Sequence, residues 1–345
     1  MKKRLTTFAK ILLILLGIPA YFAADMYYYA KQPASPTAPE QVVINVLPGQ
    51  GFQKTVQDLY QNHLIHHPLK FRMMAKWQKL DRKIIAGEYE LSTGMTPLTI
   101  IEYMTKGIVR LRKLCIPEGY NLSQIADAIE KSGICSKENF MNAVKDAKLI
   151  SSMEIPVSGF EGYLFPDTYF FSKGVPPEQI ISAMVKQFHK TFQDDWKKRT
   201  DELGLTPHEI ITLASIIEKE TGVAEERAVV SSVFHNRLKQ NMRLASDPTV
   251  IYGIEDFNGD ITKADLKRPT PYNTYLIQGL PPGPIANPGA ESIKAALYPA
   301  TTDYLYFVAK GDKTHQFSKS LAEHNQAVKK YQLNRNSSRT GADSP

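Results

Sequence analysis

The stretch TPHEIITLASIIEKETG, residues 206 to 222, is the part of this chain that most clearly decides its fold. Thr206 suits a helix N-cap, Pro207 suits the first helical position, and Glu209 completes a capping box. Apolar residues then recur at helical spacing until Gly222, which is a common stop signal. The stretch therefore predicts a capped helix whose apolar stripe enters a core.

One carboxylate lies near the end of this predicted helix. Helical geometry places Glu218 beside Ile211 and Ala214, at the border between the apolar stripe and a polar side that carries Ser215. The small neighbours leave room for a ligand, so Glu218 is a candidate catalytic group. The alternative is a surface residue in the last turn. Glu220 points roughly the opposite way, and we expect its substitution to leave most activity intact.

Composition and charge narrow the class of protein. The chain has 345 residues, of which 43% are hydrophobic, so it can bury a sizeable core in more than one domain. A net charge of +7 suits an anionic partner such as a membrane surface, a nucleic acid or a polymer that carries carboxylates. The basic residues are scattered and form no nucleic-acid motif, so a nucleic-acid partner is not expected. A plain basic surface is the alternative.

The N-terminus predicts a membrane anchor. Basic residues at positions 2, 3, 4 and 10 precede an apolar run, residues 11–30, in which Asp25 is the only charged side chain. This run is long enough to span a bilayer, its basic flank predicts a cytoplasmic N-terminus, and three tyrosines at positions 27–29 suit the membrane interface. A cleaved signal peptide is the alternative, but no A-x-A cleavage site follows the run.

The rest of the chain predicts an α+β protein. After the anchor, residues 1–30, a Pro-rich linker covers residues 31–41. Three strand-turn-helix units fill residues 42–135, and the middle one resembles part of the LysM module, which binds glycans; an ordinary strand-helix unit is the alternative. A helix-rich domain with long Pro- and Gly-rich loops covers residues 136–335, and a disordered tail covers residues 336–345.

Other chemical motifs are absent from the sequence. Cys115 and Cys135 allow either one disulfide or two free thiols. His63 and His67 have a metal-like spacing, but Pro68 follows them and a structural role is favoured. The chain has no serine-hydrolase elbow, no phosphate-binding glycine loop and no zinc motif. We expect neither a metal nor a cofactor.

Seven ordered motifs carry a family resemblance. These are GFEGYLFPDTY, LASIIEKET, VFHNRL, LASDPTVIYG, YNTY, GLPPGPIANPG and YLYFVA with HQFSKSLAEHN. Together they closely resemble the MltG (YceG-like) family of membrane-anchored endolytic murein transglycosylases, almost from end to end of the chain. The resemblance implies an inner-membrane enzyme with its body in the periplasm or facing the wall, a LysM-like subdomain, and a catalytic domain over residues 136–335.

The resemblance also implies a mechanism and its residues. A lytic transglycosylase cuts the β-1,4 bond between MurNAc and GlcNAc with one glutamic acid, which first donates a proton and then accepts one as the muramic C6 hydroxyl closes a 1,6-anhydro ring. The family's catalytic glutamate corresponds to Glu218 in this sequence. Residues in the other motifs are expected to line the cleft, and for Asp247 and Asn273 a role in holding turns is the alternative: Glu161, Ser215, Asp247, Asn273 and Tyr275.

Two other functions stay open from the sequence. One is a non-catalytic glycan-binding scaffold of the cell-wall machinery, and the other is a muramidase that uses water and needs two carboxylates. In each case the expected partners are nascent peptidoglycan strands, the membrane and peptidoglycan synthases. Termination of glycan polymerisation is a further role that the resemblance implies.

Overall fold

The protein has a mixed α+β fold, as its sequence predicts. The computed structural model describes residues 2–155, 159–255 and 257–333, with side chains from residue 15 onward, and the predicted disordered tail lies outside this range. Within it, the strands form three two-stranded sheets. The chain divides into two compact units, residues 1–112 with 170–174 and residues 113–169 with 175–345.

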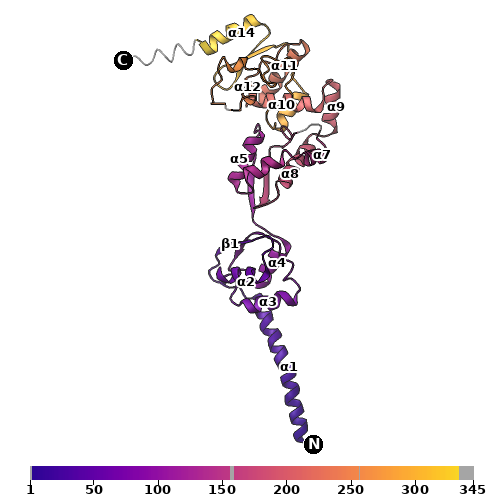
Figure 1. Ribbon diagram of the computed structural model, residues 1–345, viewed down its shortest axis with the longest axis vertical. Helices are drawn as coiled ribbons and strands as arrows, with labels where there is room; N and C mark the ends of the chain where they lie inside the picture. The colour runs from indigo at the N-terminus through magenta and orange to yellow at the C-terminus, as the bar shows by residue number, and fades with distance from the viewer. Residues whose placement is uncertain (1, 156–158, 256, 334–345) are drawn as a thin grey trace, which may run out of the picture. The chain divides into compact units, whose positions relative to one another are not determined.

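The first unit is built around one antiparallel strand pair (Figure 1). It contains α1 (Lys2–Lys31), β1 (Gln41–Val46), α2 (Phe52–Gln61), α3 (Pro68–Trp77), β2 (Gly87–Ser92) and α4 (Pro97–Lys106). Ile44 of β1 lies opposite Tyr89 of β2. Alternation along the strand sends Ile44 and Val46 into a core that also holds Phe71 and Ile100, so the helices cover the inner side of the sheet.

The helix α1 covers the predicted apolar run, and its last turns join the core of the first unit. Met26 and Tyr29 are buried there, and the Asp25 carboxylate pairs with Lys70 of α3 at 2.8 Å. Within the described part of the chain, no helix combines the length and the hydropathy that crossing a bilayer requires. The predicted span begins among residues 2–14, whose side chains are outside the description.

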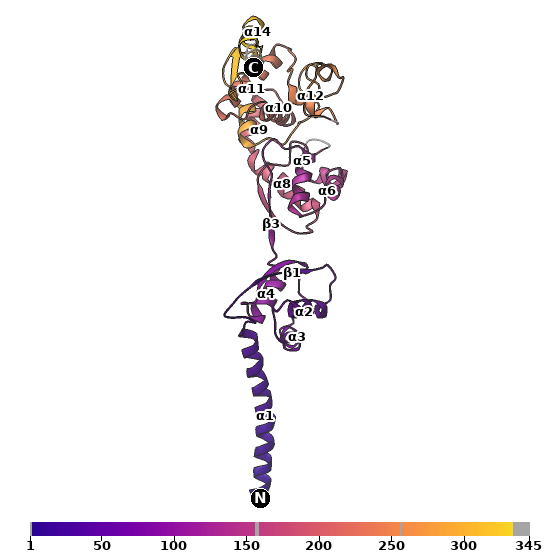
Figure 2. The same cartoon turned by 90° about the vertical axis from the view of Figure 1, so that its left-hand side faces the viewer.

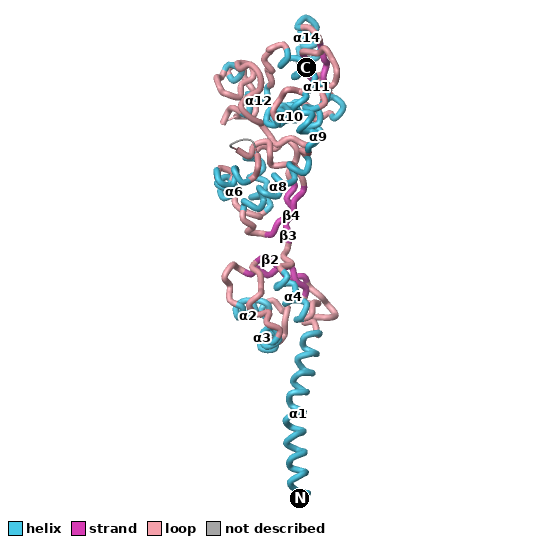
Figure 3. Tube along the Cα trace, turned by 90° about the vertical axis from the view of Figure 1, so that its right-hand side faces the viewer, coloured by secondary structure: helices cyan, strands magenta, loops and turns pink. Residues whose placement is uncertain are grey.

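The second unit is mostly helical, with long connecting loops (Figure 3). Besides β1 and β2, two further strand pairs occur in the described chain. β5 (Tyr306–Ala309) pairs with β6 (His315–Ser318) inside the second unit, and β3 (Leu111–Cys115) pairs with β4 (Thr168–Ser172), whose residues are divided between the two units. The helices are α5 (Leu122–Ser132), α6 (Lys137–Ala143), α7 (Ala147–Ser152), α8 (Pro177–Thr191), α9 (Asp194–Glu202), α10 (Pro207–Glu220), α11 (Arg227–Lys239), α12 (Asp247–Tyr252), α13 (Ala290–Leu297) and α14 (Leu321–Val328). Short turns of helix add η1 (Ala224–Glu226), η2 (Asp265–Lys267) and η3 (Lys329–Leu333).

The helix α10 is the centre of the second unit (Figure 2). Its predicted capping box is present, because Thr206 accepts the N–H of Glu209 and the Glu209 carboxylate accepts the N–H of Thr206. Residues 210–217 are all buried, since α11, α12 and α13 pack around them. The predicted polar side is therefore wrong: Thr212 and Ser215 are buried and donate hydrogen bonds to carbonyls of their own helix.

Three further details bear on the expectations from the sequence. The predicted boundary at residue 135 falls inside the second unit, because α5 packs on α6 and α6 packs on α8. The helix α10 ends with Thr221 as an extended C-cap, so Gly222 does not close it in the left-handed conformation. Cys115 and Cys135 are both free thiols.

Candidate active site

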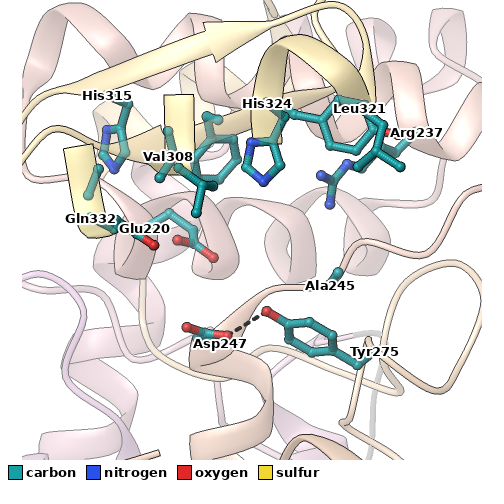
Figure 4. Close-up of a pocket in the computed structure, with 14 residues that line it drawn as sticks. Glu220, Arg237, Ala245, Asp247, Tyr275, Val308, His315, Leu321, His324 and Gln332 are labelled. Carbon is teal, nitrogen blue, oxygen red and sulfur yellow. Dashed lines mark hydrogen bonds between the residues drawn. The ribbon is translucent and has the colours of Figure 1, made fainter. Parts of the chain in front are cut away.

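A pocket of about 510 Å³ opens where α10 ends (Figure 4). The ends of α10 and α11, the start of α12 and the loop around residue 275 contribute to it, and the β5–β6 strands with α14 cover it from the other side. The lining carries acids and hydroxyls toward one wall and cationic or imidazole groups toward the other: Glu220, Asp247 and Tyr275, then Arg237, His315 and His324.

Glu220 supplies the most unusual group in this pocket. Its carboxylate accepts a hydrogen bond from the Ser246 hydroxyl at 2.5 Å. The pKa of Glu220 is raised to about 7, mainly by burial and in part by the nearby negative charge of Asp247, while Ser246 and Arg237 oppose the rise. A carboxyl group with this pKa is about half protonated at neutral pH, so it can both give and take a proton.

Asp247 and Tyr275 form a pair beside Glu220. The Tyr275 hydroxyl donates a hydrogen bond of 2.6 Å to Oδ1 of Asp247 (Figure 4). Burial and this bond raise the pKa of Tyr275 well above its ordinary value, so the phenol remains a donor. Both residues line the pocket, and the negative charge of Asp247 lies where it favours the protonated form of Glu220.

The opposite wall is held by aromatic and cationic contacts. The Arg237 guanidinium lies over the Tyr306 ring at 5.3 Å and donates from Nε to the carbonyl of Leu305 at 2.7 Å. The His324 ring stacks on the same tyrosine, with ring centres 5.2 Å apart. His315 bonds through Nδ1 to the Glu226 carboxylate at 2.7 Å, which ties β6 to the turn before α11. These contacts fix the β5–β6 strands over the pocket.

Glu218 does not line this pocket. Its carboxylate accepts the N–H of Gly289, the N-cap of α13, at 3.0 Å. A Cβ atom at Gly289 would meet the Glu118 carboxylate, which would have to move aside. The N-terminus of a helix attracts negative charge, so Glu218 is placed to join the end of α10 to the start of α13.

Glu161 is another carboxyl group of this unit that is surrounded by hydrogen-bond donors. It accepts hydrogen bonds from the Leu122 N–H, the Tyr252 hydroxyl and the Asn287 amide, at 3.2, 3.0 and 3.0 Å. Burial raises its pKa to about 7 although all three bonds lower it. Glu161 lines a separate pocket of about 370 Å³ together with His208 and Tyr272, so the structure does not bring it to Glu220.

Ser215 and Asn273 hold loops instead of facing the pocket. The Ser215 hydroxyl accepts the N–H of Ile285 at 3.0 Å, which fastens the 280s loop to α10. The Asn273 amide donates to the carbonyls of Leu266 and Arg268 and accepts the N–H of Tyr275. Both side chains are fully buried. The alternative of a turn-holding role is therefore the one that the structure favours for Asn273.

Three pocket groups were missed by sequence reasoning. Arg237, His315 and His324 occur inside motifs that resemble the family, VFHNRL and HQFSKSLAEHN, but no spacing rule links them to residue 220. Among the described residues, no group of three or more His, Cys, Asp or Glu side chains is arranged to hold a metal ion. The lining side chains of the pocket can transfer protons and can donate or accept hydrogen bonds.

Comparison with known proteins identifies the family. A profile of the YceG-like family matches residues 44–330, which includes both walls of the pocket. The chain belongs to the YceG-like family. A relative from Bacillus subtilis (strain 168), named endolytic murein transglycosylase, is 35% identical over 329 residues that cover 90% of this chain and 91% of the relative.

Other YceG-like relatives agree with this assignment. An endolytic murein transglycosylase of Streptococcus pneumoniae (serotype 2, strain D39) is 29% identical over 87% of this chain, which spans 60% of the pneumococcal protein. A crystal structure of a YceG-like protein from Listeria monocytogenes matches with a TM-score of 0.58 and 36% identity, over 84% of this chain and all of the other.

Proposed function

We propose that this YceG-like chain is an endolytic murein transglycosylase. It cuts the β-1,4 bond between MurNAc and GlcNAc inside glycan strands and leaves 1,6-anhydro-MurNAc ends. Support comes from the family assignment and from relatives that carry the same name over most of this chain. The observation that carries the chemistry is the pocket at the end of α10, with one protonatable carboxyl group on its wall.

We assign the acid and base role to Glu220. Its protonated carboxyl donates to the glycosidic oxygen as the bond from that oxygen to C1 of MurNAc breaks, and the electron pair stays on the leaving oxygen. The C6 hydroxyl oxygen of the same sugar then bonds to C1, and its proton passes to the Glu220 carboxylate. The enzyme regains its starting state without water, so a single carboxyl group with a pKa near 7 suffices.

Asp247 and Tyr275 position this acid. The charge of Asp247 favours the protonated form of Glu220, and positive charge that develops at C1 would be stabilised by the same carboxylate. Tyr275 holds Asp247 through its hydroxyl at 2.6 Å. The opposite wall, with Arg237, His315 and His324, offers donors to the polar groups of the glycan or its peptide substituents.

Glu218 remains the rival for the catalytic role, because the family resemblance points to it. The two glutamates differ in their surroundings, and this difference supports the assignment to Glu220. Glu218 bonds to a backbone N–H at a helix start, whereas Glu220 lines the large pocket. The matched variants Glu218→Gln and Glu220→Gln therefore test the assignment directly, and the geometry favours loss of activity in the second.

We further propose that α1 holds the protein in the cell inner membrane, with the N-terminus in the cytoplasm and the second unit in the periplasm. Exposed apolar side chains along the described part of α1 support this placement: Leu15, Leu16, Ile18, Tyr21 and Phe22. The region from residue 42 to 108 is proposed to position glycan as a LysM-like subdomain. If this region, expressed alone, shows no association with purified murein, the LysM-like proposal fails.

Product analysis tests the proposed activity. The full chain is incubated with uncrosslinked glycan strands, and the fragments are identified by mass spectrometry. Internal fragments with 1,6-anhydro ends support the transglycosylase. Fragments with reducing ends would indicate a water-using muramidase instead, and intact strands would indicate a non-catalytic glycan-binding scaffold.

A further inference from the structure

The helix α3 in the first unit has an outer face that no other part of the unit covers. Its inner face places Phe71, Met74 and Ala75 in the core. Leu69, Met73 and Trp77 follow one another at intervals of four residues and form a stripe along the outer side, with exposed fractions of 66%, 38% and 75%. A tryptophan that is three-quarters exposed at the end of an apolar stripe is unusual for a free protein surface.

Basic side chains border this stripe. Helical geometry places Arg72 and Lys76 along one edge of it and Lys70 along the other. Residues 69–83 hold six Lys or Arg side chains against one Asp, which is most of the positive excess of the chain. Lys70 is paired with Asp25, but in the described chain no carboxylate lies within ion-pair distance of Arg72 or Lys76. The face is therefore apolar at its centre and positively charged at its edge.

The position of α3 beside α1 indicates what this face meets. Lys70 pairs with Asp25 of α1, and the Tyr29 hydroxyl of α1 donates to the carbonyl of His67 at 3.1 Å. In all three views α3 lies at the end of the first unit from which α1 leaves (Figures 1, 2 and 3). The exposed apolar part of α1 begins at the same level, with Tyr27 and Tyr28 both exposed.

We propose that α3 is an interfacial helix that lies on the anionic surface of the membrane. The side chains of Leu69, Met73 and Trp77 enter the boundary between headgroups and acyl chains, and Arg72 and Lys76 contact lipid phosphates. A helix with an apolar stripe, a basic border and an aromatic side chain has the chemistry that binds such a surface. The inference rests on the membrane placement of α1 proposed above, and it adds a second contact that fixes the first unit against the bilayer.

The size of the face argues against a protein partner. A stable protein interface buries about 800 Å² on each side, and a helix of ten residues is only about 15 Å long. Three side chains on such a helix expose much less than that area. A lipid surface has no minimum area, and each basic group near it adds about a fivefold gain in partitioning. A docked protein would instead leave the stripe indifferent to lipid composition.

Tryptophan fluorescence tests the proposal, because the chain contains only Trp77 and Trp196. Trp196 is partly buried, packs against the core of the second unit and serves as an internal control. The full chain is placed in nanodiscs of phosphatidylcholine and phosphatidylglycerol whose acyl chains carry bromine, a contact quencher. The emission of Trp77 is the difference between the emission of the wild type and that of Trp77→Phe. We expect the bromine to quench this difference strongly and to quench the remaining emission of Trp77→Phe only a little.

A matched pair of charge reversals completes the test. Arg72→Glu with Lys76→Glu should weaken the quenching of Trp77, whereas Lys197→Glu with Lys198→Glu on α9, an equal charge change, should not. If the chain floats with vesicles but Trp77 is quenched no more than Trp196, the α3 contact is wrong and the anchor stands. If the chain does not float with vesicles, both the membrane anchor and the α3 contact are wrong. Equal quenching in phosphatidylcholine alone would overturn the role given to Arg72 and Lys76.

Discussion

The replacement of Glu220 by glutamine tests the pocket reasoning most sharply. The amide is close in size to the carboxyl but cannot donate its proton to the glycosidic oxygen. General acid catalysis contributes about a hundred- to ten-thousand-fold, or roughly 3–5 kcal/mol of barrier, so Glu220→Gln should nearly abolish the release of anhydro-ended fragments. Glu218→Gln is the matched control and should keep most activity, because its side chain joins two helix ends.

Glu220→Gln should lower the activity but raise the stability of the folded chain above neutral pH. An unfolded glutamate loses its proton near pH 4.5, whereas Glu220 in the folded chain loses it at about 7. Between these pH values the folded state holds more protons, so stability falls as pH rises, by about 3 kcal/mol in total for this group. Glu220→Gln removes that loss, so at pH 8 it should unfold at a higher urea concentration than the wild type.

Loss of activity in Glu220→Gln and its higher urea midpoint at pH 8 would together support the assignment of Glu220. The assay is quantified release of 1,6-anhydro-muramyl fragments, with urea unfolding at pH 5 and pH 8 on the same samples. The wild type should also lose activity about tenfold for each pH unit above about 7, as the acid form disappears. If Glu218→Gln is inactive while folded Glu220→Gln is active, the pocket is not the active site.

The remaining predictions concern the neighbours of this acid and the loops around it. Asp247→Asn removes a charge that raises the pKa of Glu220, so the alkaline fall of the pH–rate profile should move to lower pH. Tyr275→Phe removes a hydrogen bond to a charged group, worth about 1.5–3 kcal/mol, and should lower kcat about tenfold or more with little change in fold by circular dichroism. Ser215→Ala leaves the buried N–H of Ile285 without its acceptor and should cost about 1–3 kcal/mol of unfolding free energy, with KM unchanged; a raised KM at full stability would instead favour the substrate-binding role expected from the sequence. Asn273→Ala should likewise lower the urea midpoint, since two carbonyls lose their donor.

The local signals of the sequence were reliable where the fold depends on neighbouring residues. The capping box at Thr206 and Glu209 needs only nearby residues, and it is present. The opposite directions of Glu218 and Glu220 also follow from helix geometry. The family resemblance rested on ordered motifs, and the comparisons confirm it.

The position of the pocket could not be read from the same signals. Which side of α10 faces a ligand depends on β5, β6 and α14, which begin more than eighty residues later in the chain. Helical periodicity placed Ser215 on a polar side of α10. In the structure the loop at Ile285 covers that side, and its N–H donates to the Ser215 hydroxyl. Side chains such as His324 and Arg237 meet only through these long-range contacts, so sequence spacing carries no record of them.

The cover of the pocket comes from the end of the chain, and this has a consequence for synthesis. The acid on α10 leaves the ribosome well before the strands from Tyr306 to Ser318 and the helix from Leu321 that close over it. A chain that ends before Tyr306 carries the carboxyl group of Glu220 with one wall of its pocket missing. A copy that ends before Tyr306 is therefore expected to be harmless to the cell wall, because the capacity to cut requires the segment from Tyr306 onward.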